Sequence, residues 1–128
     1  MQVRFKGLLP ELMGIELQEA SADKVIATMT VRKDLCTLGD SLHGGAIMAF
    51  ADTLGAIAAI LNMPANSRTT TIESKTNFIG GAPLGTRITG DSVPVHRGRT
   101  TVVCQTTVRG ETGKLVALVT QTQLVIAG

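Results

Sequence analysis

The sequence predicts an α+β fold in which an antiparallel sheet of five or six strands wraps around one long central helix. Two observations support this prediction. Segment 43–61 is almost wholly apolar and long enough for a helix, whereas residues 15–32 and 68–126 contain short alternating or β-branched runs typical of strands. A sheet of this length needs cover on one face, and segment 43–61 is the only element apolar enough to provide it.

The composition indicates one globular unit and excludes several functions. A chain of 128 residues suffices for one core, so we expect a single domain over residues 1–128. Hydrophobic residues make up 44% and charged residues 17%, which is too apolar for a disordered chain. The net charge of +2 is dispersed, and the chain has no Trp, no Tyr and three Phe. We therefore expect no nucleic-acid partner, which would require a basic patch or stacking aromatic residues.

The cysteines and the N-terminal sequence favour a cytoplasmic protein. Cys36 and Cys104 lie far apart, without the CxxC spacing of a zinc site or the pattern of a disulfide framework, so we expect buried or half-buried thiols and no metal site. A proline and two acids within the first 16 positions interrupt the apolar core that a signal peptide needs. Residues 45–61 are at the short limit for a membrane span and carry Asp52 at their centre, so we expect a buried helix and no membrane partner.

The elements expected before the long helix are a short helix and a pair of strands. The first dozen residues are compatible with a short helix. In residues 24–32, KVIATMTVR, every second residue from Val25 is apolar, which is the pattern of a strand with one buried face. A segment near 15–19 is expected to pair with this strand through a turn at 21–23.

Four further strands are expected after the helix. They occupy residues 68–78, 86–95, 100–108 and 114–126. In the first of them, one face is expected to hold Ile72, Ser74, Thr76 and Phe78. The second ends at the turn HRGR, and the last two form a hairpin across residues 109–113.

The long helix is apolar around its whole circumference, yet it contains one acid. We expect the helix to be enclosed, because its apolar residues point in every direction: Ile47, Met48, Phe50, Ala51, Leu54, Ile57, Ala58 and Leu61. Burying an unpaired carboxylate such as Asp52 costs several kcal/mol. Either this carboxylate is hydrogen-bonded to Thr53, to a strand threonine or to an arginine across an interface, or it is a nucleophile or general base poised by partial desolvation.

A glycine turn precedes the helix. In the stretch SLHGG, Ser41 or His43 is a candidate N-cap, and Gly44 and Gly45 let another molecule approach the backbone closely. The free N–H groups of a first helical turn favour negative charge, so the two glycines form a candidate oxyanion and substrate-binding site. The simpler interpretation is that the glycines permit a tight strand-to-helix turn and that His43 caps the helix.

The spacing of the two candidate groups indicates a dimer. Gly44 and Asp52 are eight residues apart, which is about 12 Å along a helix axis at 1.5 Å per residue. One substrate carbon cannot touch both, so a shared reaction requires two chains whose helices run antiparallel across a two-fold axis. The sequence therefore predicts a homodimer with two interfacial sites, each combining Gly44 of one chain with Asp52 of the other.

The motif around these residues resembles the hotdog-fold acyl-CoA thioesterases, in particular the group similar to the phenylacetate-pathway and 4-hydroxybenzoyl-CoA thioesterases. The motif reads LHGGAIMAFADTLGAIAA, with the acid nine positions after the histidine. The resemblance continues through ESKTNFIGGAPLG, VHRGRTTVV and TGKLVALVTQTQLVI and covers roughly residues 30–128. It implies a hotdog fold and hydrolysis of an acyl-CoA thioester without a cofactor, since CoA is part of the substrate. It also implies a homodimer or a homotetramer built from it.

The resemblance implies roles for single residues. The backbone N–H of Gly44 polarises the thioester carbonyl, and His43 shapes the turn near it. Asp52 of the other chain attacks the carbonyl or activates water. Arg97 and Arg99 of the HRGR turn are implied to contact the phosphates of CoA, and the alternative for both is a solvated hairpin turn.

Two positions depart from the family pattern near the expected site. Thr37 stands six residues before the motif histidine, where relatives often carry Asn or Gln. Ala56 stands one turn after the acid, where a hydroxyl often lies. Thr70 or Thr71 is expected to supply the missing hydroxyl, and Thr71 is the better match.

These departures leave other functions open. Without the usual polar groups at Thr37 and Ala56, the chain is also compatible with a non-catalytic acyl-CoA binding module. Gly80-Gly81 replaces a frequent Arg-Pro, which removes one phosphate contact. A hotdog dehydratase is disfavoured, because its usual histidine-containing loop is not visible in the sequence.

Overall fold

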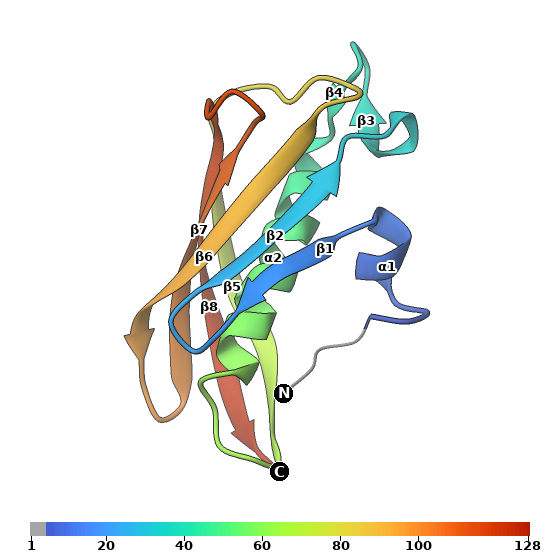
Figure 1. The fold of residues 1–128 in the computed structure, drawn as a ribbon. Coiled ribbons are helices and arrows are strands. Elements are labelled where there is room, and N and C mark those ends of the chain that lie inside the picture. The colour runs from blue at the N-terminus through green and yellow to red at the C-terminus, as the bar shows by residue number, and fades with distance from the viewer. Residues whose placement is uncertain (1–4) are drawn as a thin grey trace.

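The computed structural model describes residues 5–128 and contains one six-stranded sheet wrapped around a long helix (Figure 1). The helix is α2 (Gly44–Ile60), and the strands are β1 (Glu16–Ala20), β2 (Val25–Thr30), β5 (Ser67–Phe78), β6 (Arg87–Arg97), β7 (Thr101–Arg109) and β8 (Leu115–Ala127). The strand order is β1-β2-β6-β7-β8-β5, and every neighbouring pair is antiparallel. The predicted architecture is confirmed, and each predicted strand begins and ends within two residues of the observed one.

Short elements precede the long helix. α1 (Leu9–Met13) is the short helix expected near the N-terminus. A 3-10 turn, η1 (Lys33–Leu35), and a small hairpin of β3 (Cys36–Thr37) and β4 (Ser41–Leu42) were not predicted, because segments of two or three residues are too short to show a period. This hairpin leads the chain into the start of α2, at the upper end of the molecule in Figure 1. No described helix is long and apolar enough to cross a membrane.

Side chains hold both ends of α2. His43 has extended backbone and its Nδ1 accepts the Gly45 N–H at 2.8 Å, so this histidine is the N-cap. Beyond the last turn, Asn62 Nδ2 donates to the carbonyl oxygens of Ala58 and Ala22, both at 2.8 Å. These two bonds satisfy a terminal helix carbonyl and fix the helix to the turn between β1 and β2.

The core lies between α2 and the inward face of the sheet. Phe50 and Leu54 of the helix are fully buried there, and each such side chain contributes about 1.5–3 kcal/mol. Gly90 on β6 makes room for them, because a Cβ at this position would lie 2.5 Å from Phe50 Cε2. A larger residue would push the helix away from the sheet, so this glycine sets their spacing.

One face of α2 is not enclosed within a single chain, and in this respect the prediction was wrong. The face toward the sheet holds the buried residues Ile47, Phe50, Ala51, Leu54, Gly55, Ile57, Ala58 and Ala59. A stripe along the helix, which we call the open face, consists of the half-buried residues Met48, Ala49, Asp52, Thr53, Ala56 and Ile60. Apart from Asp52 and Thr53 both faces are apolar, so the hydrophobic period did not show which one the sheet covers.

A bulge changes the facing pattern of β5. The register with β8 shifts between Thr71 and Glu73, so Ile72 is the extra residue, and it is 57% exposed. Thr71 before the bulge and Ser74 after it are both half-buried. The prediction that Ile72 shares a face with Ser74 was therefore wrong, because strict alternation does not allow for an inserted residue.

Candidate active site

Asp52 lies in the middle of α2, and the sheet holds one of its carboxylate oxygens. Thr71 Oγ1 of β5 donates to Asp52 Oδ1 at 2.6 Å, and Gln121 Nε2 of β8 donates to the same oxygen at 3.1 Å. Among residues 5–128, no hydrogen bond reaches the second oxygen, Oδ2. Thr53 instead donates its hydroxyl to Ala49 O at 2.8 Å. The expected strand threonine is thus present, and one carboxylate oxygen stays available.

The available oxygen belongs to a group that lines a small hollow. The hollow has a volume of about 290 Å³ and is lined by Met48, Ala49, Asp52, Thr71 and Ser74. Its lining combines small or flexible apolar side chains with two hydroxyls. A half-buried carboxylate in such surroundings can accept a proton from water or attack an electrophilic carbon.

A chain of polar side chains continues behind Thr71. Gln123 Nε2 donates to Thr71 Oγ1 at 2.6 Å, and Thr69 Oγ1 lies 3.0 Å from Gln123 Oε1. Gln121 and Gln123 are fully buried. A threonine hydroxyl has only one hydrogen, so Thr71 accepts from Gln123 and gives its own hydrogen to the acid. We call Thr69, Thr71, Gln121 and Gln123 the polar network.

The sequence analysis missed both glutamines of the network. Gln121 approaches the helix so closely that a Cβ at Gly55 would lie 2.3 Å from its Cδ. A glycine inside a helix costs about 1 kcal/mol relative to alanine, and here it admits the amide that reaches Asp52. The signal was visible in β8, because Gln121 and Gln123 continue the inward register that begins with Val119. A polar side chain in the buried register of a strand indicates a specific partner.

The glycine turn lies at the start of α2, and one of its amides is already used. The Gly45 N–H donates to His43 Nδ1, which requires a neutral imidazole with its hydrogen on Nε2. The Gly44 N–H is the first amide of the helix and has no carbonyl one turn earlier to accept from it. Phe78 packs beside this amide, since a Cβ at Gly44 would lie 3.1 Å from the ring Cε1. Among residues 5–128 no acceptor binds the Gly44 N–H, so Gly44 offers a free donor at this turn.

Three other residues singled out in the sequence have clear positions. Thr37 is exposed on β3, in the hairpin that leads into α2. Thr70 is exposed on the outward face of β5, because neighbours in a strand alternate and Thr71 faces the helix. Close packing requires a glycine at position 80, because a Cβ there would lie 2.8 Å from the carbonyl oxygen of Leu115.

Arg97 and Arg99 lie at the opposite end of the molecule from His43. In Figure 1 the loop between β6 and β7 is at the lower end, whereas β4 and the start of α2 are at the upper end. Arg97 Nη2 pairs on the surface with Asp23 Oδ1 at 2.7 Å. Arg99 is exposed and lines a hollow of about 400 Å³ that also includes Ser67. Within one chain, neither arginine shares a site with the glycine turn.

The two thiols do not join the site. Cys104 Sγ lies 3.9 Å from Gly55 O, and burial raises the pKa of this thiol to about 11, although nearby Arg97 acts to lower it. Such a thiol stays protonated near neutral pH and is a poor nucleophile. Cys36 is half-buried, with its Sγ 3.3 Å from Arg32 O. In the described part of the chain, no three His, Cys, Asp or Glu side chains gather as a metal site requires.

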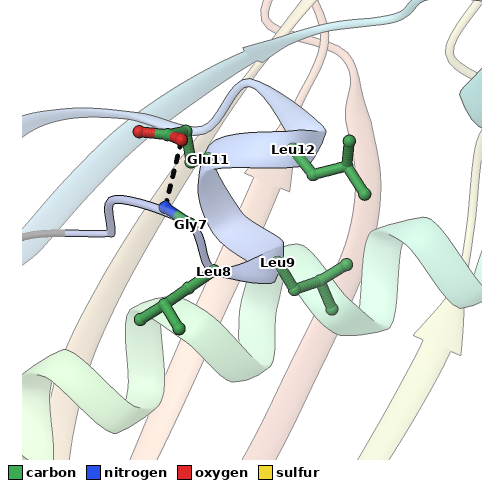
Figure 2. Close-up of a pocket in the computed structure, with 5 residues that line it drawn as sticks. All are labelled: Gly7, Leu8, Leu9, Glu11 and Leu12. Carbon is green, nitrogen blue, oxygen red and sulfur yellow. Dashed lines mark hydrogen bonds between the residues drawn. The ribbon is translucent and has the colours of Figure 1, made fainter.

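A larger hollow lies away from these groups, beside α1. Its volume is about 450 Å³, and its lining consists of Gly7, Leu8, Leu9, Glu11 and Leu12. Figure 2 shows the three leucine side chains projecting from α1 and its N-terminal end, and the Gly7 N–H donating to Glu11 Oε1 at 3.1 Å. None of the predicted site residues lines this hollow.

Comparisons with known proteins converge on one family. Residues 39–117 match the family model described as the thioesterase superfamily. A candidate esterase of Vibrio cholerae is 31% identical over 113 residues, which are 88% of this chain and 75% of that protein. The structure of a mutant thioesterase from Pseudomonas aeruginosa is similar with a TM-score of 0.89 and 27% identity, covering 94% of this chain and 87% of that one. A Streptococcus mutans protein, solved with acetyl-CoA bound, has a TM-score of 0.82 and 26% identity over 88% of this chain and 89% of its own.

Proposed function

The chain belongs to the thioesterase superfamily and has the hotdog fold, and from this premise we propose that it hydrolyses an acyl-CoA thioester to the free acid and CoA. The observation that carries the proposal is Asp52, whose Oδ1 is held by two donors from the sheet while Oδ2 is available. The acetyl-CoA bound to the Streptococcus mutans relative supports CoA thioesters as the substrate class.

In the proposed reaction Asp52 supplies the attacking oxygen or activates it. As a nucleophile, its free oxygen bonds to the thioester carbon, the carbon–sulfur bond breaks and CoA leaves as a thiolate that takes a proton from water. The hydroxide left by that proton transfer then hydrolyses the mixed anhydride to the free acid and restores the Asp52 carboxylate. As a general base, the same oxygen accepts a proton from water while the water oxygen attacks the carbon. The carbon–sulfur bond then breaks, and Asp52 returns the proton to the leaving CoA thiolate. Both routes consume one water in total and need no metal or redox cofactor.

The oxyanion that forms on the thioester oxygen is proposed to bind the Gly44 N–H of a second chain. Along one helix, Gly44 and Asp52 are about 12 Å apart, too far to serve one carbon. The open face of α2 supports pairing, because Ala49 and Ala56 flank the acid with small side chains that allow close approach of another helix. One such oxyanion donor typically contributes about 3 kcal/mol to the transition state. His43 maintains the turn that presents this amide.

The same antiparallel arrangement favours the predicted CoA contacts. It brings the β6–β7 loop of one chain to the side of the partner's glycine turn, although the two lie at opposite ends of a single chain. Arg97 and Arg99 are then proposed to meet the CoA phosphates. For Arg97 this requires exchange of the surface pair with Asp23, which costs little because both side chains are exposed. Thr37 and Gly45 are proposed to lie beside the thioester.

The test is release of CoA thiol from a panel of aromatic and aliphatic acyl-CoAs. We expect turnover by the wild type and a loss of about 10²–10⁴-fold in kcat for Asp52→Asn, because the variant keeps the shape of the side chain but loses its basicity. Cys104→Ala is the matched control and should retain full activity, because its thiol is buried. Equal turnover by Asp52→Asn and wild type would remove Asp52 from the mechanism.

The same panel separates hydrolysis from the alternative of a non-catalytic binding module. Binding of CoA esters by the wild type without thiol release, measured by calorimetry across the whole panel, would favour the binding module. If the wild type neither binds nor hydrolyses any CoA ester of the panel, both functions are refuted.

A further inference from the structure

We propose that Gln123 and Gln121 are positioning residues that orient the Asp52 carboxylate, so that Oδ1 is held against the sheet and Oδ2 is the reacting oxygen. The inference deepens the proposed hydrolysis and rests on it. It starts from two fully buried glutamines that no step of the proposed reaction uses.

Counting hydrogens gives the direction of the two bonds nearest to Asp52. An ionised carboxylate can only accept, so the Thr71 hydroxyl must donate its single hydrogen to Oδ1. The Thr71 oxygen then needs a donor on its other side, and Gln123 provides one with Nε2 at 2.6 Å. With the amide in this orientation, Gln123 Oε1 faces the Thr69 hydroxyl at 3.0 Å and shares its single hydrogen with Leu124 O, which also lies at 3.0 Å.

The reversed amide would break this order. If Gln123 turned its Oε1 toward Thr71, this oxygen and Asp52 Oδ1 would compete for one hydroxyl hydrogen, so either Gln123 Oε1 would lack the donor or Asp52 Oδ1 would keep only the Gln121 amide. Because Gln123 donates to the Thr71 oxygen, Thr71 directs its own hydrogen to Asp52.

The contact between Gln121 and Asp52 comes at a cost to the free energy of folding. Its Nε2 bonds Asp52 Oδ1 at 3.1 Å, while its Oε1 is buried and has no hydrogen-bond partner among the described residues. A buried unpaired carbonyl is unfavourable for folding. An apolar side chain at this position would avoid that cost, so the amide is explained by the bond it makes to the acid.

The two donors on Oδ1 have a direct chemical consequence. They prevent the carboxylate from rotating freely, and they leave Oδ2 as the oxygen with lone pairs available to water or to a thioester carbon. The glutamines do not line the hollow beside Asp52, so they act through Thr71 and Asp52 rather than on substrate.

The experiment is a double-mutant cycle on kcat and KM with an acyl-CoA that the wild type hydrolyses. Gln123→Met deletes the amide at nearly constant volume, and Thr71→Val deletes the hydroxyl. We expect Gln123→Met to lower kcat about tenfold with KM changed less than twofold. In the Thr71→Val background the same change should lower kcat less than twofold, because the connection to Asp52 is already cut. Thr71→Ser should retain most of the activity.

Two kinetic outcomes would overturn the proposal. One is an unchanged kcat in Gln123→Met. The other is an equal loss of kcat in both backgrounds, since that would indicate a packing effect. If Gln123→Met does not fold, Gln123→Asn takes its place, because it keeps an amide but withdraws it from the Thr71 hydroxyl.

A spectroscopic readout separates failure of this proposal from failure of the proposed function. In ¹⁵N NMR spectra, Asp52→Asn should shift the side-chain amide signals of both Gln121 and Gln123. With Thr71→Val present, the Gln123 signal should no longer respond to the change at Asp52. If the signals respond in this way but the protein hydrolyses no acyl-CoA, the proposed hydrolysis is refuted and the positioning role is not. If the protein hydrolyses acyl-CoA but the Gln123 signal does not respond to Asp52→Asn, the positioning role is refuted and the hydrolysis is not.

Discussion

Within one chain, hydrogen bonds hold one end of the proposed site in place, whereas the other end presents an amide without an acceptor. Asp52, in the middle of α2, is held by the polar network of its own subunit. Gly44, at the start of the same helix, presents an amide without an intrahelical acceptor and is flanked by the half-exposed ring of Phe78. In the proposed mechanism, the acid is therefore oriented as soon as the chain folds, whereas the oxyanion site is completed by substrate and a second chain.

The largest expected effect tests whether the two ends belong to different chains. Asp52→Asn and Gly44→Pro homodimers should each be nearly inactive. A purified mixed dimer holds one site with both groups intact, so its activity should rise to about half that of wild type, on the order of 100-fold above either parent. The measurement is acyl-CoA turnover by dimers carrying two different tags. No recovery in verified mixed dimers would place each site within one chain.

The next effect isolates the Gly44 amide. Proline is tolerated at the first position of a helix, and His43 already has φ −62° and ψ 137°, which suits a residue before proline. Gly44→Pro should therefore keep the helix and lower kcat about 10²–10³-fold by removing one N–H. Gly44→Ala is the matched control, since its Cβ meets the same Phe78 ring at 3.1 Å but the amide stays. Similar kcat values in the two variants would contradict the oxyanion role.

A smaller effect is expected where the helix meets the polar network. Gly55→Ala would raise helix propensity by about 1 kcal/mol, yet its Cβ would lie 2.3 Å from Gln121 Cδ. We expect the displaced amide to release Asp52 Oδ1 and to lower kcat about tenfold, with reduced stability in urea unfolding. Ala56→Gly, on the open face, is the control that changes propensity without touching Gln121. A more stable and fully active Gly55→Ala would show that the close contact does not matter.

The smallest effect on activity is expected from Cys104, which lies outside both ends of the site. Its folded pKa of about 11 lies above the ordinary 9.0, because burial disfavours the thiolate. The unfolded chain therefore loses this proton first, so the contribution to stability is complete below pH 9 and is lost as the pH rises toward 11. We expect a loss of about 2 kcal/mol by pH 11 in urea unfolding. Cys104→Ala should lack this part of the pH dependence and keep wild-type kcat at neutral pH.

The sequence predicted those features that depend on local pattern. α2 and the strands followed from periodicity, whereas the His43 cap and the contact between Asp52 and a strand threonine were each one of several alternatives that the sequence left open. The inward register of the two glutamines could be seen in β8, but the contact of Gln121 with Asp52 could not, because it arises only from the placement of β8 beneath α2. The open face of α2 was also missed, since its side chains are nearly as apolar as those that face the sheet.

The β5 bulge makes one residue of this strand dispensable for the facing pattern. Ile72 is an extra residue between two stretches that both turn their hydroxyls toward α2. Deleting it would leave Thr71 inward, Glu73 outward and Ser74 inward, so regular alternation would continue with the same partners on β8. In an alignment of related sequences, a single-residue gap at this position therefore marks a chain with a regular strand that still turns its threonine toward the acid. A point substitution of Ile72 should likewise have little effect, because its side chain is 57% exposed.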